Sequence, residues 1–361
     1  MNHSETISLN INRTITFGAA LWLGVSLSAT GAAATTIHQP FAPTAASANA
    51  GTASTAKPSA AARARARAAR IRAARARATR SAKALADAKT PRYRTDSTGN
   101  VVPDIRAAAA IIYNPATGKV LYEENSMDER SIASITKVMT AIVFLENVTD
   151  LNQEVTIARA DTLRASTTYL KTNDRVRISD LLHLLLIPSD NAAARALARI
   201  SPLGSDGFIA RMNQKADDLG LDHTAYTDPS GLMSDNISSA YDMARLIAFA
   251  AEDDRIGPIM RTPEYSFRTT KGRIITVRST NQILRAGDID VVGGKTGFIG
   301  KAGYCLATLL KMPQGGPSLA VVILGASSSV NRFWETRHLM AWLAERTQML
   351  GLTTPVVATA Q

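Results

Sequence analysis

The feature that most limits how this chain can fold is a tract of alanine and arginine over residues 60–90, whose only large aliphatic side chains are Ile71 and Leu85. Alanine and arginine both favour helices, so the tract can be helical, but without an apolar stripe it cannot pack a core. The core must therefore come from elsewhere. We place the folded body between Val101 and Gly351, a length sufficient to bury one.

The positive charge of the chain is concentrated in the same region. The formal net charge is +11, and the stretch from Lys57 to Arg94 holds 13 basic residues against one acidic residue, Asp87. The remaining 28 basic and 29 acidic residues nearly cancel, which argues against a body that binds nucleic acid. We interpret the tract as an electrostatic tether to an anionic envelope surface, either lipid head groups or cell-wall polymer. A solvated linker is the alternative, and in a cytoplasmic protein the partner would be nucleic acid.

The N-terminus has the pattern of an export signal. Residues 15–29 are an apolar run, preceded by Arg13 and followed by three alanines at 32–34. Such a run with a small-residue cleavage site is typical of a secretory signal peptide, and it falls short of the ~20 apolar residues of a membrane span. We therefore expect an exported, periplasmic protein rather than a cytoplasmic one with a frayed apolar end. The expected regions are a signal peptide (1–34), a disordered Ala/Arg-rich basic linker (35–100), a folded domain (101–351) and a short tail (352–361).

Cysteine and histidine usage excludes several site types. Cys305 is the single cysteine, so neither an intrachain disulfide nor a zinc site built on several thiolates can form. The five histidines show no ligand-like spacing. We expect no metal and no cofactor.

The hydrophobic pattern of the body predicts an α+β fold. Two strands flank a turn at 114–118, a helical middle follows, and strands and a terminal helix close the body. We therefore expect an antiparallel sheet assembled from both ends of the body, with an inserted helical subdomain. The strands are expected at 107–113, 119–123, 273–278, 289–297, 302–311 and 318–325, and the helices at 134–147, 179–187, 190–200, 206–219, 239–252 and 331–347.

Three short motifs carry the candidate chemistry: Ser134-Ile135-Thr136-Lys137, Ser189-Asp190-Asn191 and Lys295-Thr296-Gly297. The pattern of the first, Ser-x-x-Lys, also occurs at 54–57, and the second recurs as the same tripeptide at 234–236. Placement separates the copies, because Ser134 begins an apolar helix that puts it on one face with Lys137, and Ser189 joins two helices. The order and spacing of the three motifs is a stronger signal than any one of them.

These residue types predict an acyl transfer. The Ser134 hydroxyl needs a base to become a nucleophile, and with no Ser-His-Asp order in the chain that base is Lys137. A lysine serves as a base near neutral pH only if burial and a neighbouring cation depress its pKa, and we assign Lys295 as that cation.

The other motif residues complete this mechanism. Ser189 is expected to relay a proton to the leaving amine, and Asn191 to hold the substrate amide and orient Lys137. The backbone N–H groups of Ser134 and Phe298 are expected to form the oxyanion hole.

With its flanking segments the body resembles the serine penicillin-recognising enzymes, and within them the low-molecular-mass D-alanyl-D-alanine peptidases. The segments that carry the resemblance are 115–122, 130–137, 228–232, 238–242, 280–281, 294–298 and 302–306, and it extends over 107–346. It implies a β-lactamase/transpeptidase-like fold. It also implies that peptidoglycan stem peptides, or β-lactams as covalent inhibitors, acylate Ser134 before water releases the acyl group.

The resemblance also implies which residues bind substrate, and two subtypes remain open. Thr296, Gly297 and Phe298 would line the substrate, and Arg332 falls where carboxypeptidase relatives place a cation for the terminal carboxylate. A solvated helix residue is the alternative for Arg332. The general look of the motifs, and the absence of a further domain after the last helix, favour a D,D-endopeptidase that cleaves D-alanyl-diaminopimelate cross-links. Arg332 favours a D,D-carboxypeptidase.

Three rival classes fit less well. A class A β-lactamase needs a Glu-x-x-x-Asn deacylation motif, and Glu252 and Glu264 lack the partner asparagine. An inactive envelope-binding protein conflicts with three intact motifs. A nucleic-acid binder acting through residues 57–94 conflicts with export.

Overall fold

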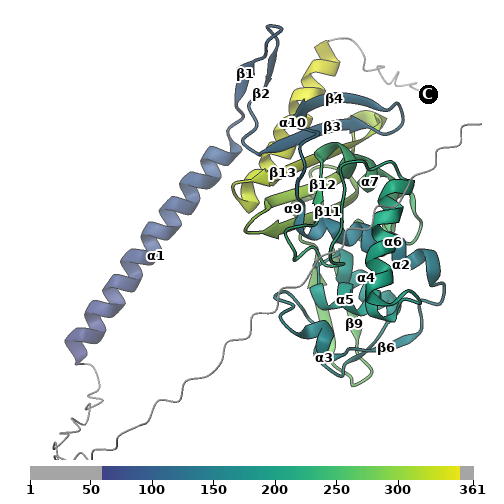
Figure 1. The fold of residues 1–361 in the computed structure, drawn as a ribbon. Helices are drawn as coiled ribbons and strands as arrows, with labels where there is room; N and C mark the ends of the chain where they lie inside the picture. Colours follow the sequence, from purple (N-terminus) through teal and green to yellow (C-terminus); the bar gives the residue numbers. More distant parts are fainter. Residues whose placement is uncertain (1–58, 350–361) are drawn as a thin grey trace, which may run out of the picture. The chain divides into compact units, whose positions relative to one another are not determined.

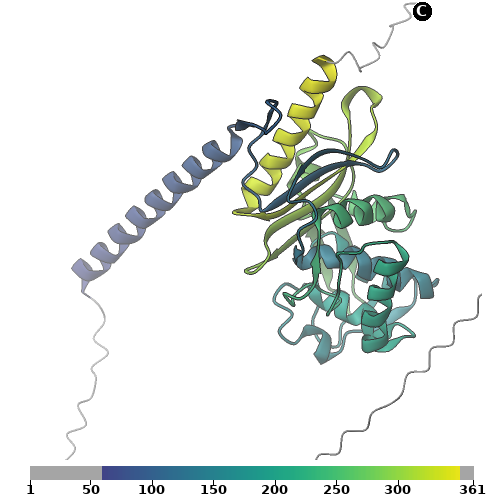
Figure 2. The ribbon, with the colours of Figure 1, turned by 45° about the horizontal axis from the view of Figure 1, so that its top comes forward.

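The computed structural model describes residues 59–349 (Figures 1 and 2). The expected signal peptide (1–34), the first part of the expected linker (35–58) and the expected tail (352–361) lie outside the described residues. The chain divides into two units, Met1–Arg63 and Ala64–Gln361, and the second unit contains the sheet and all the candidate site residues.

A five-stranded antiparallel sheet forms the centre of the body, and its strand order is β11-β12-β13-β3-β4. The order joins the two ends of the body, because β13 pairs with β3 in the register Val322↔Ile111. This arrangement confirms the expected α+β sheet. The strands are β3 (Ala109–Asn114), β4 (Lys119–Glu124), β11 (Val291–Ile299), β12 (Gly303–Lys311) and β13 (Ser318–Ala326).

Helices cover both faces of this sheet. Because successive residues of a strand point to opposite faces, neighbouring residues of one strand pack against different helices. Ile112 packs with Phe333 of α10 (Ser329–Met349), whereas Ile111 packs on the opposite side in the core that includes Met243 of α7 (Ala240–Glu252). Figure 1 shows α10 and α7 against the sheet. The β-branched and aliphatic runs of β3 and β13 are buried on both faces for this reason.

The inserted region is mainly helical and shares the α7-side core. Its centre is α2, whose residues from Lys137 to Leu145 are all buried. The helices of the region are α2 (Lys137–Asn147), α3 (Arg159–Thr162), α4 (Ile178–Leu186), α5 (Asn191–Ile200), α6 (Gly204–Asp218), α8 (Gly257–Met260) and α9 (Gln282–Ala286). Short strand pairs join β5 (Arg130–Ser131) to β8 (Ile237–Ser238), β6 (Glu154–Thr156) to β7 (Arg175–Arg177), and β9 (Glu264–Arg268) to β10 (Ile274–Arg278).

Two expected elements differ from the structure. The helix expected from residue 134 begins as a 3₁₀ turn, η1 (Ala133–Thr136), and the α-helix starts at Lys137. The strand expected at 273–278 is present as β10, but it pairs with β9 in a hairpin outside the main sheet. Its outward residues are exposed, which fits a solvated ribbon better than a central strand.

The expected disordered linker over 35–100 is corrected in its second half. Residues Ala60–Lys89 form the helix α1, none of whose residues is buried. The high helix propensity of alanine and arginine explains the helix, and the lack of large apolar side chains explains its exposure. Folded structure also begins before Val101, because β1 (Tyr93–Thr95) pairs with β2 (Val101–Pro103).

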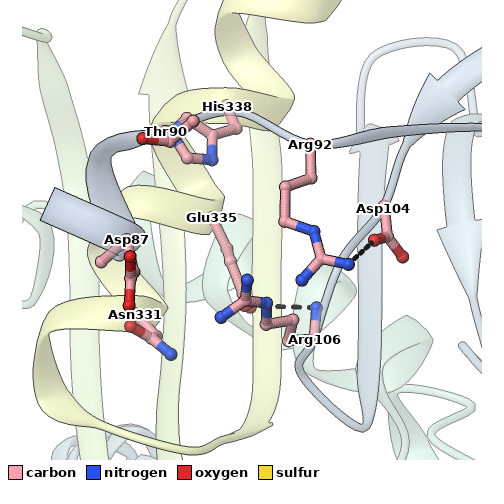
Figure 3. Close-up of a pocket in the computed structure, with 9 residues that line it drawn as sticks. Asp87, Thr90, Arg92, Asp104, Arg106, Asn331, Glu335 and His338 are labelled. Atoms are coloured by element: carbon pink, nitrogen blue, oxygen red, sulfur yellow. Dashed lines mark hydrogen bonds and ion pairs between the residues drawn. The ribbon is translucent and has the colours of Figure 1, made fainter. Parts of the chain in front are cut away.

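The entry of the chain into the body is held by polar contacts with α10. The Glu335 carboxylate accepts hydrogen bonds from the backbone N–H groups of Arg106 and Ala107, each at 3.2 Å. Arg92 pairs with Asp104 at 2.7 Å beside them (Figure 3). These contacts fix where β3 starts. A short 3₁₀ turn, η2 (Pro313–Gly315), connects β12 to β13. Between residues 59 and 349, no helix is both long and apolar enough to cross a lipid bilayer.

Candidate active site

The Ser134 hydroxyl lies directly against the Lys137 ammonium group. Lys137 Nζ donates a hydrogen bond to Ser134 Oγ at 2.9 Å, which confirms that one turn separates the two side chains on a shared face. Ala133, the residue before the serine, has a φ of +49°, in the left-handed region that non-glycine residues rarely adopt. Such strain persists only where the surrounding structure holds it, and it clusters at functional sites.

Two further acceptors fix the position of the Lys137 side chain, which is fully buried. Asn191 Oδ1 accepts a hydrogen bond from Lys137 Nζ at 2.6 Å, and the backbone carbonyl of Ser230 accepts another. The Ser134 hydroxyl also donates to the Ser230 carbonyl at 3.5 Å. Lys137 Nζ is thus held by three oxygens, one of which belongs to the candidate nucleophile.

The Ser-Asp-Asn motif is positioned at the N-terminus of α5. Asp190 caps the helix by accepting from the Ala193 N–H at 3.0 Å, and Asn191 Nδ2 donates to the Ala165 carbonyl at 2.7 Å. Ser189 stands before the cap with a φ of +66°. The second Ser-Asp-Asn tripeptide has no such setting, because Ser234 is exposed and Asn236 is a buried loop residue.

Lys295 connects strand β11 to the Ser189 turn. Its Nζ donates to Ser189 Oγ at 2.7 Å and to the Thr296 carbonyl at 2.8 Å, and the residue is 1% exposed. The three sequence motifs therefore meet in space. Lys137 is bonded to Ser134 and to Asn191, and Lys295 is bonded to Ser189.

Burial lowers the pKa of both lysines. Desolvation is the main cause at Lys137 and brings its pKa to about 7; the carboxylates of Asp228 and Asp190 oppose the shift, and Arg195 adds to it. The pKa of Lys295 is also lowered well below its ordinary value by burial, and next by the charge of Lys137 and then Arg332. The expected lowering by burial is confirmed, but the cation that adds to it is Arg195 and not Lys295 as expected from the sequence.

Gly297 allows strand β11 to approach the nucleophile closely. A Cβ atom at Gly297 would stand 2.6 Å from the Ile132 carbonyl oxygen and 3.1 Å from the Ser134 nitrogen, inside normal contact distance. The backbone of β11 therefore passes directly beside the serine that precedes α2. This placement is the one required if the N–H groups of Ser134 and Phe298 are to face a common oxygen.

The other expected substrate residues have different environments. Phe298 is 51% exposed and stacks on Tyr304, with ring centroids 4.2 Å apart. Thr296 is buried and its hydroxyl shares a 2.6 Å hydrogen bond with that of Thr280. Arg332 is not the solvated helix residue considered as its alternative, because it is 7% exposed. Its Nη1 donates to the carbonyls of Gly297 at 3.0 Å and Cys305 at 3.1 Å, so it supports β11 and β12.

Comparison with known proteins identifies the family. A model of a peptidase family, described as D-alanyl-D-alanine carboxypeptidase, matches residues 96–328. This match covers about two thirds of the chain. The chain belongs to this family of serine peptidases. Its β-lactamase-like fold of mixed helix and antiparallel sheet agrees with the expectation from sequence. The family match ends at residue 328, so it does not include Arg332.

Relatives of both subtypes are found. A D-alanyl-D-alanine endopeptidase of Pseudomonas aeruginosa is 32% identical over 244 residues, which cover 66% of this chain and 78% of the relative. The D-alanyl-D-alanine carboxypeptidase DacF of Bacillus subtilis is 31% identical over 232 residues, covering 63% of this chain and 59% of the relative. The crystal structure of the Streptomyces K15 DD-transpeptidase matches with a TM-score of 0.63 and 29% identity, over 66% of this chain and 97% of that one.

Two members of the site lie outside the three sequence motifs. Ser230 contributes a backbone carbonyl to Lys137, and Asp228 accepts hydrogen bonds from the Ser230 backbone N–H at 2.9 Å and from its hydroxyl. From the sequence, this segment had contributed to the family resemblance alone. A signal was present, because Asp-Pro-Ser-Gly is a turn sequence in which the aspartate side chain bonds to its own backbone two residues on.

Proposed function

We propose that this D-alanyl-D-alanine peptidase is a D,D-endopeptidase that cleaves D-alanyl-diaminopimelate cross-links in peptidoglycan through an acyl-enzyme on Ser134. The observation that carries the proposal is the buried contact between Lys137 Nζ and Ser134 Oγ at 2.9 Å. With a pKa of about 7, Lys137 has a large neutral fraction at neutral pH, so it can accept the serine proton as Ser134 attacks the D-alanyl carbonyl.

The remaining steps use the residues around this pair. The oxyanion that forms on the attacked carbonyl is stabilised by the N–H groups of Ser134 and Phe298. The proton that Lys137 has taken from Ser134 is relayed through the Ser189 hydroxyl to the leaving amine, and Lys295 is bonded to that hydroxyl. Asn191 binds the substrate amide and holds Lys137. Water then attacks the ester by the same route in reverse and releases the shortened peptide.

Endopeptidase activity is supported by the relatives that bear this name, which match over 76% to 63% of this chain at 31% to 33% identity. Arg332 does not decide the subtype. The scissile nitrogen of a cross-link belongs to the D-centre of diaminopimelate, which carries a carboxylate on the adjacent carbon, just as a terminal D-alanine does. Because both leaving groups carry a carboxylate at this position, a cation such as Arg332 would favour the cross-link and the terminal D-alanine alike.

The test of the subtype uses a cross-linked muropeptide dimer and a pentapeptide monomer as substrates. The chain and its S134A variant are incubated with each, and the products are resolved by mass. Splitting of the dimer by the unmodified chain alone is the expected result. Release of alanine from the pentapeptide with an intact dimer would make the enzyme a carboxypeptidase instead.

We also propose that the protein is exported to the periplasm by residues 1–34 and that α1 contacts an anionic envelope surface. The support for the second part is that α1 is exposed along its length and carries ten basic residues against Asp87. These residues occur on all sides of the helix, so attraction would be electrostatic and would weaken with salt.

A vesicle assay tests the role of α1. Co-sedimentation with anionic vesicles should exceed that with zwitterionic vesicles and fall as salt rises. Deletion of residues 60–89 should abolish it and leave peptidase activity intact. Equal binding by the deleted chain would contradict the tether.

A further inference from the structure

The segment Asp228-Pro229-Ser230-Gly231 packs against Ser134 and Lys137, the candidate nucleophile and its base. At Gly231, whose φ is +73°, a Cβ atom would stand 2.0 Å from the Ala133 carbonyl oxygen, so the loop touches the backbone just before the nucleophile. The Pro229 carbonyl accepts a hydrogen bond from the Thr140 hydroxyl of α2 at 2.6 Å. The loop is therefore attached on both sides of Lys137.

The Asp228 carboxylate organises this loop. One of its oxygens accepts from the Ser230 backbone N–H and hydroxyl, and the other accepts from the Met233 N–H at 3.1 Å and from the Asn236 side-chain amide. Four donors saturate the carboxylate, and although burial acts to raise the pKa of Asp228, these hydrogen bonds hold it below its ordinary value. The group is thus charged throughout the neutral range.

We propose that Asp228 is a positioning residue for the lysine base, because it fixes the Ser230 carbonyl that receives the Lys137 ammonium group. This inference rests on the proposed function, in which Lys137 is the base. Asp228 touches neither Ser134 nor Lys137 in the hydrogen-bond network, so it acts through the Ser230 backbone and through its field.

The charges around Lys137 define what Asp228 contributes. Asp190 faces it from the cap of α5 and Arg195 from α5 itself, while Lys295 faces it from β11 and Asp228 from the loop. After burial, Asp228 is the largest influence on the pKa of Lys137, and it acts to raise it. A neutral residue at 228 would let the pKa of Lys137 fall further, so that the base stays active at lower pH.

Replacing Asp228 by asparagine also removes one acceptor oxygen. The four donors then compete for a single oxygen and face an amide NH₂ group, so the Ser230 carbonyl loses its fixed position. Two effects are expected together: a lower maximal rate, and an acid limb of the pH–rate profile displaced to lower pH. A residue that only stabilised the fold would lower the rate without moving the limb.

The experiment measures acylation of the full chain by a fluorescent penicillin across the range from about pH 5 to pH 9. For D228N we expect a plateau rate about 10- to 100-fold below the unmodified chain and an acid limb about one pH unit lower. The matched control is D242N, the same change at a carboxylate that is 1% exposed and accepts from the His223 N–H and the Thr224 hydroxyl. Its acid limb should stay in place.

A second variant covers the case in which D228N does not fold. D228E keeps the charge but displaces the carboxylate, so its acid limb should remain that of the unmodified chain while its plateau rate falls. An unmoved D228N limb, a moved D228E limb or a D228E plateau equal to that of the unmodified chain would overturn the inference. Absence of labelling in the unmodified chain, or equal labelling of S134A, would instead overturn the proposed function itself.

Discussion

Lys295 Nζ donates a hydrogen bond to Ser189 Oγ at 2.7 Å, and this contact joins the edge strand of the sheet to the turn before α5. The two residues come from different parts of the body and meet near Ser134, which lies in the 3₁₀ turn just before α2. Because Ser189 adopts a φ of +66°, its side chain is held by a backbone that few residues tolerate. The contact therefore depends on both the turn and the strand being in place.

Loss of the Ser189 hydroxyl should reduce turnover of the peptide substrate. We expect S189A to lower kcat/KM by about 100- to 1,000-fold, because the proton path to the leaving amine is interrupted. S234A is the matched control, since it alters the same tripeptide at an exposed position and should leave kcat/KM unchanged. Equal effects of the two variants would remove Ser189 from the mechanism.

The acylation rate should depend on the protonation of Lys137. Its pKa in the folded chain is about 7, lowered chiefly by burial, and only the neutral amine can accept the serine proton. The second-order rate constant for acylation should thus fall about tenfold for each pH unit below that value. Stopped-flow acylation by a chromogenic β-lactam over a pH series measures this limb. A rate that stays constant down to about pH 5 would exclude Lys137 as the base.

A side chain at position 297 should separate β11 from the nucleophile. We expect G297A to lower acylation by at least about 100-fold, because its Cβ would press on the Ile132 carbonyl and the Ser134 nitrogen. G300A is the matched control, since a Cβ there would meet no atom within 4 Å. Acylation rates measured for both variants at one pH give the comparison, and comparable rates would show that the close approach is dispensable.

Arg332 should support both possible reactions to the same degree. In R332L the carbonyls of Gly297 and Cys305 lose their guanidinium donor, so we expect a lower melting temperature and a loss of activity that is equal on the muropeptide dimer and the pentapeptide. R332K should recover part of the stability. The check is a thermal unfolding curve together with kcat/KM on both substrates. A loss confined to the pentapeptide would assign Arg332 to the terminal carboxylate alone.

The sequence predicted the parts of the site that rest on side chains at characteristic spacing. Ser134 and Lys137 are one turn apart in any helical geometry, and Ser189, Asn191 and Lys295 were found through their motifs. The main sheet was predictable because its central strands, β12, β13 and β3, are apolar runs that are buried along most of their length. By contrast, the β9–β10 hairpin is a solvated ribbon whose residues alternate between partly buried or buried and exposed, so only its second strand was recognised.

The residues that could not be found from the sequence act through backbone atoms, or through contacts that exist only once distant segments pack together. The Ser230 carbonyl has no sequence signature, because every residue carries one, and its role depends on the loop that Asp228 holds. Arg195 influences Lys137 only because α5 packs beside α2. The left-handed backbone at Ala133 could not be foreseen, since local preference disfavours it and tertiary contacts impose it.

The most direct test of the account is to locate the acyl group after brief exposure to benzylpenicillin. The full chain, S134A and K137R are treated at neutral pH, and intact masses and peptide maps are compared. We expect one penicilloyl group on Ser134 of the unmodified chain, none on S134A, and labelling of K137R slowed by about 1,000-fold, because arginine keeps the charge but cannot act as the base. Acylation of S134A at another residue, or of K137R at the unmodified rate, would contradict the account.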